Sequence, residues 1–157
     1  PSTTCGGTVT AVAGSGTLTF AGGSVGASAS CTVSVDVTAA GSGSYDNTSG
    51  ALTSSLGTSG TAADTLVVVP PPGFAKAFAP NPIVQGAVST LTFTVDNTAS
   101  ALAATALDFT DNLPAGVEVA TPPNAASTCG GPVTATAGTG TVSVTGGGAD
   151  AASTSTR

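Results

Sequence analysis

The sequence predicts an all-β protein built from many short strands separated by tight turns. Three observations lead to this fold class. Thr and Val, which favour strands, are abundant. Polar and apolar residues alternate with a period of two in several short segments. Gly, Pro, Asn and Ser separate these segments, and none carries the apolar stripe and capping residues of a helix. Many short strands at this spacing are typical of an immunoglobulin-like β-sandwich.

The alternation is clearest in seven segments, each short enough to be one strand. Phe74–Phe78 places Phe, Lys and Phe at alternate positions, and Cys31–Val37 places Val at every second position from Val33 onward. Leu66–Val69 is a short apolar run that stops at a proline, which indicates a final strand. In chain order, the alternating segments are 8–13, 16–20, 31–37, 74–78, 89–95, 104–109 and 140–144.

The chain contains one repeat and part of a second. Residues 2–25 and residues 126–149 are identical at 13 of 24 positions without a gap, at an offset of 124 residues. Cys5 and Cys129 stand at matching positions, each followed by two glycines. A period of this length indicates tandem domains rather than a solenoid of short repeats.

A proline-rich segment marks the boundary between the repeats. Residues 70–73 read Pro-Pro-Pro-Gly, which cannot continue a sheet and forms a short, stiff spacer. We therefore expect residues 1–69 to be the C-terminal half of one repeat. Residues 74–157 would be the N-terminal part of the next repeat.

The low charge of the chain excludes several classes of function. Only 6% of the residues are charged, against about 25% in a typical soluble domain. Lys and Arg together number 2, too few to neutralise the phosphates of a nucleic acid. Because there is no His, a Ser-His-Asp triad is impossible. No segment reaches the ~20 apolar residues of a membrane-spanning helix. We expect no enzyme, no cofactor and no membrane insertion.

Several segments together resemble a bacterial immunoglobulin-like surface-repeat domain, here in permuted order. The opening of that domain resembles residues 74–97, and its Phe-Thr-Asp-x-Leu-Pro-x-Gly segment resembles Asp108–Gly116. Its later half is similar to residues 129–135, 31–37 and 43–48. The resemblance implies sandwich domains arranged in tandem in large secreted, adhesin-like or fibre proteins.

Three residues could carry chemistry: Lys76, Asp111 and Asn47. Lys76 is the only lysine, and the alternation places it between Phe74 and Phe78 on a face that should be buried. Asp111 shares an apolar face with its strand neighbours, and Asn47 shares a face with Tyr45. A buried amine is costly unless it is paired, so Lys76 should have a partner.

This constellation resembles the self-made isopeptide crosslink of Gram-positive pilin and adhesin domains. The resemblance implies that Lys76 attacks the Asn47 carboxamide, with Asp111 polarising it. Two alternatives stay open: a buried Lys76–Asp111 ion pair without covalent chemistry, and a Lys76 side chain that extends to solvent at a strand end. Asn47 and Lys76 lie in different half-repeats, so they would meet only if neighbouring copies or repeats complete one sandwich.

The cysteines indicate one disulfide in an oxidising compartment. Cys5 and Cys31 are 26 residues apart, with two strand-like segments between them, and we expect them to pair. The matching partner for Cys129 would be residue 155, which is Ser155. Cys129 is therefore either free or paired with the Cys31 of another copy. Three scattered Cys without His do not match the spacing of a zinc site, and no loop has a calcium-binding pattern, so we expect no metal.

These observations predict a structural protein at the cell surface or outside the cell. Its partner would be itself, through head-to-tail copies or adjacent repeats that exchange strands. The alternative is an adhesin module that binds a ligand such as a carbohydrate. That alternative would call for exposed aromatic residues, and the chain has one Tyr and no Trp.

Overall fold

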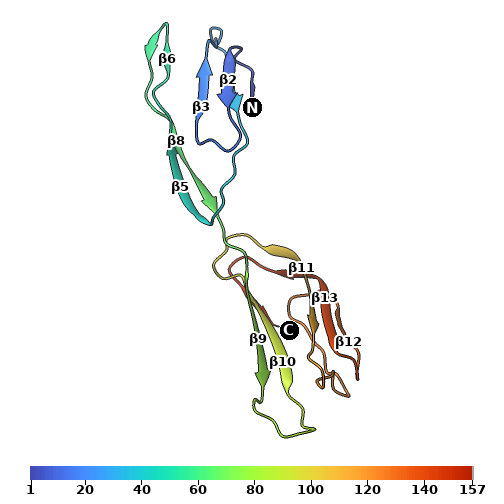
Figure 1. The fold of residues 1–157 in the computed structure, drawn as a ribbon. Coiled ribbons are helices and arrows are strands. Elements are labelled where there is room, and N and C mark those ends of the chain that lie inside the picture. The colour runs from blue at the N-terminus through green and yellow to red at the C-terminus, as the bar shows by residue number, and fades with distance from the viewer. Residues whose placement is uncertain (157) are drawn as a thin grey trace. The chain divides into compact units, whose positions relative to one another are not determined.

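The fold is all-β, as the sequence predicts. The computed structural model describes residues 1–156, and this part of the chain contains strands and loops but no helix, so none that could cross a membrane. It divides into two compact units (Figure 1). Unit 1 is Pro1–Ala40, and unit 2 begins at Gly41.

Unit 1 consists of two small antiparallel pairs. Strand β2 pairs with β3, and β1 pairs with β4. The strand bounds are Ser2–Thr3 for β1, Thr8–Ala11 for β2, Leu18–Ala21 for β3 and Val33–Ser34 for β4. The strand expected over 31–37 is thus limited to β4, because only Val33 and Ser34 find backbone partners on β1. Val37, at the end of the expected strand, is 74% exposed.

Unit 2 opens with a hairpin of β5 and β8. Strand β5, Gly43–Thr48, pairs antiparallel with β8, Ala63–Val68, over all six residues of each. A smaller hairpin of β6, Thr53–Ser54, and β7, Gly57–Thr58, lies in the segment that joins them. Pro70–Pro72 then separate β8 from the next strand, β9, which starts at Gly73.

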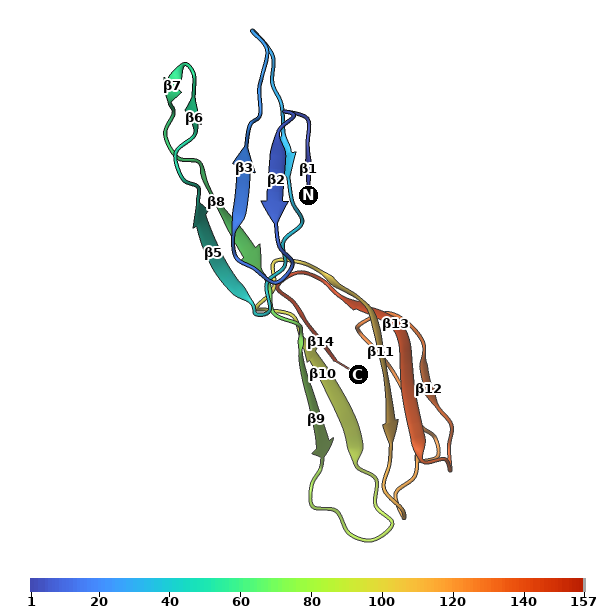
Figure 2. The same ribbon diagram turned by 45° about the horizontal axis from the view of Figure 1, so that its top comes forward.

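The remainder of unit 2 is a sandwich of two three-stranded antiparallel sheets (Figure 2). The first sheet has the order β14-β10-β9, and the second has the order β11-β13-β12. The strand bounds are Gly73–Ala79 for β9, Thr90–Asp96 for β10, Ala104–Asn112 for β11, Val133–Ala135 for β12, Thr141–Ala149 for β13 and Thr154–Thr156 for β14.

Three aromatic rings join the two sheets. Phe74 on β9 stacks on Phe93 of β10, with 5.8 Å between ring centroids. Phe109 on β11 meets both from the opposite sheet, at 5.0 Å from Phe74 and 4.7 Å from Phe93. Two buried valines adjoin this cluster: Val95 follows Phe93 by two residues on β10, and Val144 of β13 is the cross-strand partner of Phe109. The sheets therefore face each other through a small apolar core, as in the expected sandwich.

A buried asparagine fixes one end of the sandwich. The Asn97 side chain is almost fully buried, directly after β10. Its Nδ2 donates hydrogen bonds to the carbonyl oxygens of Leu102 at 2.8 Å and Asp150 at 2.9 Å. Both amide hydrogens are thus satisfied, so the buried polar group ties the ends of β10, β11 and β13 together at little desolvation cost.

The repeated sequence adopts the same local structure twice. In unit 1, the Thr32 amide donates to Thr4 Oγ1 at 2.8 Å, and in unit 2 the Thr156 amide donates to Thr128 Oγ1 at the same distance. The pairing of β2 with β3 also matches that of β12 with β13 at the 124-residue offset: Val9 faces Phe20, as Val133 faces Val144. The internal repeat is therefore structural as well as sequential.

Candidate functional site

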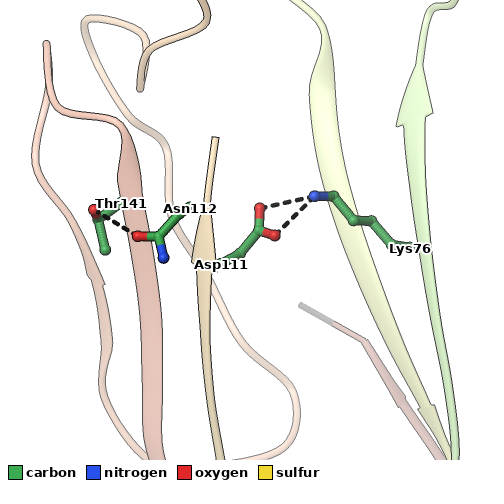
Figure 3. Close-up of polar contacts among 4 residues, drawn as sticks. All are labelled: Lys76, Asp111, Asn112 and Thr141. Carbon is green, nitrogen blue, oxygen red and sulfur yellow. Dashed lines mark hydrogen bonds and ion pairs between the residues drawn. The ribbon is translucent and has the colours of Figure 1, made fainter. Parts of the chain in front are cut away.

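Lys76 and Asp111, which the sequence singled out, form an ion pair across the sandwich. Lys76 lies on β9 in one sheet and Asp111 on β11 in the other. The Lys76 Nζ donates to both carboxylate oxygens of Asp111, at 2.8 Å each (Figure 3). The pair is the only salt bridge among residues 1–156. The structure thus brings together residues that are 35 positions apart in the sequence.

Aromatic rings surround the lysine on its own sheet. Register places Lys76 opposite Phe93 of β10. The Nζ atom lies 5.6 Å from the centroid of the Phe93 ring and 5.7 Å from that of Phe78. Both distances fall within the range of a cation–π interaction. The amine therefore sits between two rings and one carboxylate, with its charge fully partnered.

The expected burial of Lys76 is only partly met. Its side chain is 37% exposed, and that of Asp111 is 19% exposed. On the same strand, Phe74 is 59% and Phe78 39% exposed. The reason is topological: β9 and β11 are both end strands of their sheets, and they lie opposite each other. We call the strip between them, formed by Phe74, Lys76, Phe78 and Asp111, the seam.

The neighbouring Asn112 is oriented away from the seam. Its Oδ1 accepts a hydrogen bond from Thr141 Oγ1 at 3.2 Å, on the side of β13 (Figure 3). This contact joins β11 to β13 at the residue pair that closes the ladder between these strands. Asn112 therefore supports the strand that carries Asp111, and it offers no carboxamide to Lys76.

Asn47 does not meet the ion pair within the described chain. It lies on β5, opposite Asp64 of β8, and is exposed. No hydrogen bond in residues 1–156 joins it to Lys76 or Asp111. The structure thus assembles two of the three residues of the predicted constellation and leaves the third on a separate hairpin.

The hairpin that carries Asn47 has two different faces. Cross-strand partners share a face, so Tyr45 and Asn47 lie with Leu66 and Asp64, and Gly43 lies with Val68. Tyr45 and Leu66 are both exposed. On the other face, Thr65 Oγ1 donates to Asp46 Oδ1 at 2.7 Å. The hairpin therefore presents an uncovered, mainly apolar surface that includes Asn47.

The sequence alone did not predict the hydrogen bond that holds the Tyr45 side chain. Its hydroxyl donates to the carbonyl oxygen of Gly41 at 2.9 Å, four residues upstream. This is the pattern of the tyrosine corner that precedes strand F in immunoglobulin-like domains. The signal was present in the sequence: the only Tyr of the chain stands near the start of an alternating segment, after a Gly-Ser-Gly turn.

Sequence reasoning also missed an open trough in unit 2. It has a volume of about 1330 Å³ and lies between β10 and the β12–β13 ladder. Its walls are apolar for the most part and include Leu91, Phe93, Val119, Val142 and Val144. Alternation identified the inward faces of these strands, but it carries no information about how well small side chains fill the space between them.

The cysteines behave as expected where the structure describes them. Cys5 and Cys31 form a disulfide with a Cα–Cα distance of 5.0 Å. Cys129 is a buried free thiol, whose Sγ donates to the Thr156 carbonyl oxygen at 3.9 Å. Ser155, which occupies the position of Cys31 in the second repeat, is buried as well. Pairing of Cys129 with another copy stays a prediction.

Metal binding finds no support in the described residues. No group of three or more Cys, Asp or Glu side chains in residues 1–156 is arranged to hold an ion. The carboxylates of Asp96, at the end of β10, and Asp108, within β11, instead make local hydrogen bonds. Asp96 Oδ1 accepts from the amide and hydroxyl of Thr98, and Asp108 Oδ1 accepts from the amide of Gly146 at 2.6 Å.

The fold and these sites define an all-β, disulfide-bonded sandwich protein built from a repeat. The chain belongs to the family described as a domain of unknown function, DUF7933, whose family model matches residues 1–68 and again residues 72–157. The two matches break at residues 69–71, where the prolines begin. Searches of curated proteins and of solved structures found no match.

Proposed function

We propose that this chain is a structural repeat unit of an extracellular bacterial surface fibre, stalk or filament. In this proposal, residues 1–69 are the C-terminal half of one immunoglobulin-like repeat and residues 74–157 the N-terminal part of the next. Strands from a neighbouring copy or repeat complete each sandwich. Two separate matches to one family model, on either side of a proline-rich linker, support a tandem arrangement.

The observation that carries the proposal is the repeat within the structure. The hydrogen bonds between Thr4 and Thr32 recur between Thr128 and Thr156, and the register of β2 with β3 recurs in β12 with β13. A unit that recurs along the chain in this way is typical of tandem structural repeats. Within residues 1–156, the nine-residue strand β11 pairs with β13 along one edge only, and a free edge of this length can accept a further strand.

The composition and the disulfide support an extracellular location. Disulfides persist in oxidising compartments, and Cys5–Cys31 is formed. Lys and Arg together number 2, which leaves few sites for trypsin-like proteases. Both properties suit a structural element that is exposed outside the cell.

The proposal includes a covalent lock between Lys76 and Asn47. The Lys76 Nζ would form an amide bond to the Asn47 Cγ, while the bond from Cγ to Nδ2 breaks. The amine hydrogen, passed through the Asp111 carboxyl group, would leave with Nδ2 as ammonia. The ion pair already holds Nζ 2.8 Å from the carboxylate oxygens, so the lysine and its acid partner are in position.

Two measurements on the purified chain test the two parts of this proposal. Light scattering coupled to size exclusion should give masses of several chains, and a mass of one chain at every concentration would contradict complementation. Boiled, reduced gels should show a ladder, with an intact mass lower by one ammonia per bond. Lys76→Met should abolish both the ladder and the loss of mass. A wild-type sample that runs as single chains of unchanged mass would contradict the covalent lock.

A further inference from the structure

We infer that the β5–β8 hairpin of one copy adds to the free edge of β11 in a second copy. In this arrangement, β5 is the pairing strand, it runs antiparallel to β11, and Asn47 lies beside Asp111. The inference rests on the proposed function and specifies the two surfaces that meet.

The acceptor is the outer edge of β11. This strand has nine residues and pairs with β13 along one edge only, within the described chain. The side chains left exposed at the seam belong mainly to β9: Phe74, Lys76 and Phe78. A strand beside β11 would extend this sheet past β9 and cover these side chains from the outer side. A strand beside β9 would instead cover Phe109 and Asp111, which are already largely shielded.

The donor is the hairpin, which has the shape and the face that this edge requires. A two-stranded hairpin is marginally stable by itself and needs a partner surface. One face carries the exposed Tyr45 and Leu66 with the half-buried Val68, and these apolar side chains suit the phenylalanines of the seam. Asn47 and its cross-strand partner Asp64 lie at the other end of this face. Its opposite face carries the Thr65–Asp46 hydrogen bond and Ser44, with Val67 as its exposed apolar residue, and is the more polar of the two. Docking on β11 buries the apolar face and leaves the polar face outside.

The internal repeat identifies the hairpin as the occupant. Thr156 makes the same backbone hydrogen bond as Thr32, so the end of β14 corresponds to the residue directly before β4 in unit 1. In unit 1, the chain continues from this point through residues 33–42 into the hairpin. A hairpin of this type is therefore the element that the repeat pattern links to this segment, and a second copy of the chain carries one.

The register follows from the chemistry of the seam. Asn47 is the only carboxamide on the apolar face of the hairpin, and Lys76 and Asp111 are the only ionic groups of the seam. With Asn47 opposite Asp111, the carboxamide meets the ion pair and Tyr45 lies opposite Leu113, on the same face. Antiparallel pairing then places Thr48 opposite Thr110, and both of these residues point outward.

The test is a cross-copy disulfide at this outward pair. Thr48→Cys and Thr110→Cys are placed in separate chains of different tag length, both carrying Cys129→Ser, and the two are co-expressed. We expect a two-chain band on non-reducing gels that reduction removes. Because the two cysteines are in different chains, the band reports only contacts between copies.

The matched control replaces Thr110→Cys with Thr134→Cys, an exposed threonine on β12 at the other end of the same sheet. Circular dichroism should confirm that each variant folds. An absent band, or an equally strong band with Thr134→Cys, would overturn the inference. Light scattering on the same samples distinguishes failure of this inference from failure of the proposed function. Assemblies that lack the band would contradict only the inference, whereas single chains would contradict both claims.

Discussion

Lys76 is notable because the chain has few charged residues and places this one in an ion pair between the two sheets. It is the only lysine in 157 residues, and it pairs across two sheets with Asp111 while lying near two phenylalanine rings. An ion pair that is partly exposed contributes about 0–1 kcal/mol to stability, so stability alone gives little reason to place it there. Under the proposed function, the geometry holds an amine beside a carboxyl group at an edge that a neighbour covers.

Asp96 should make folding stability depend on pH in acid. The side-chain hydroxyl and then the backbone amide of Thr98 donate to its carboxylate, and these hydrogen bonds lower the pKa of Asp96 below its ordinary value. A lowered pKa in the folded state gives stability that is present above the unfolded pKa of about 3.9 and is lost as the pH falls through the folded pKa.

We therefore expect the melting temperature of wild type to fall more steeply below pH 4 than that of Asp96→Asn, whose amide oxygen can still accept from Thr98. Thermal melts from pH 6 to pH 2 measure this difference. Parallel pH profiles for the two proteins would contradict the assignment.

Ser155→Cys should create a second disulfide. Ser155 occupies the position of Cys31, and it is buried, as is Cys129. The local hydrogen bonds match those around the Cys5–Cys31 bond, whose Cα–Cα distance is 5.0 Å. A loop of this length stabilises by about 3 kcal/mol in the chain-entropy treatment.

Thiol titration of the denatured Ser155→Cys variant should find no free thiol, and its melting temperature should rise. Thr154→Cys, at the exposed neighbouring position, serves as the control and should leave thiols free. Two reactive thiols in Ser155→Cys would show that the two repeats differ in geometry at this point.

At the scale of elements, the glycine pair after each repeated cysteine shapes the turn into the next strand. Gly130 and Gly131 both have positive φ, at 63° and 70°. A Cβ at Gly131 would clash with the Thr145 carbonyl oxygen, whereas a Cβ at Gly130 would have no atom within 4 Å. Gly7 has the same surroundings in unit 1, where the clash would be with Ala21.

Gly131→Ala should therefore destabilise unit 2 more than Gly130→Ala does. Both variants carry the cost of a left-handed backbone, about 1–2 kcal/mol, but only the first also displaces the backbone of β13. Urea unfolding of the two variants measures the difference. Equal losses would mean that the β13 backbone moves aside without cost.

The elements could be predicted where alternation and turns agree. The segments around Phe74, Leu91 and Phe109 form strands because turn residues such as Pro80, Asn97 and Pro114 follow them and their inward residues are apolar. The 31–37 segment fails beyond Ser34, and β5 is exposed throughout, because alternation specifies which face points inward but not which neighbour covers it. The same limit explains why the Lys76–Asp111 pair was predictable and its exposure was not.

At the scale of the whole molecule, the described chain leaves apolar surface uncovered. Phe74, Phe78, Leu66 and Tyr45 are all exposed, and β9, β11, β5 and β8 each have an edge that pairs with no strand in residues 1–156. Soluble proteins usually protect long edges because these edges drive association. Under the proposed function, these edges join neighbouring copies or repeats, and a heterologous joint of this kind generates open filaments.

The central claim is that each sandwich contains strands from two copies or repeats. Cryo-electron microscopy of the assembly formed by the purified chain tests it most directly. The account predicts filaments in which a two-stranded hairpin lies against β11 and covers Phe74, Lys76 and Phe78. Single particles with the mass of one chain, or filaments in which the edge of β11 is bare, would contradict it.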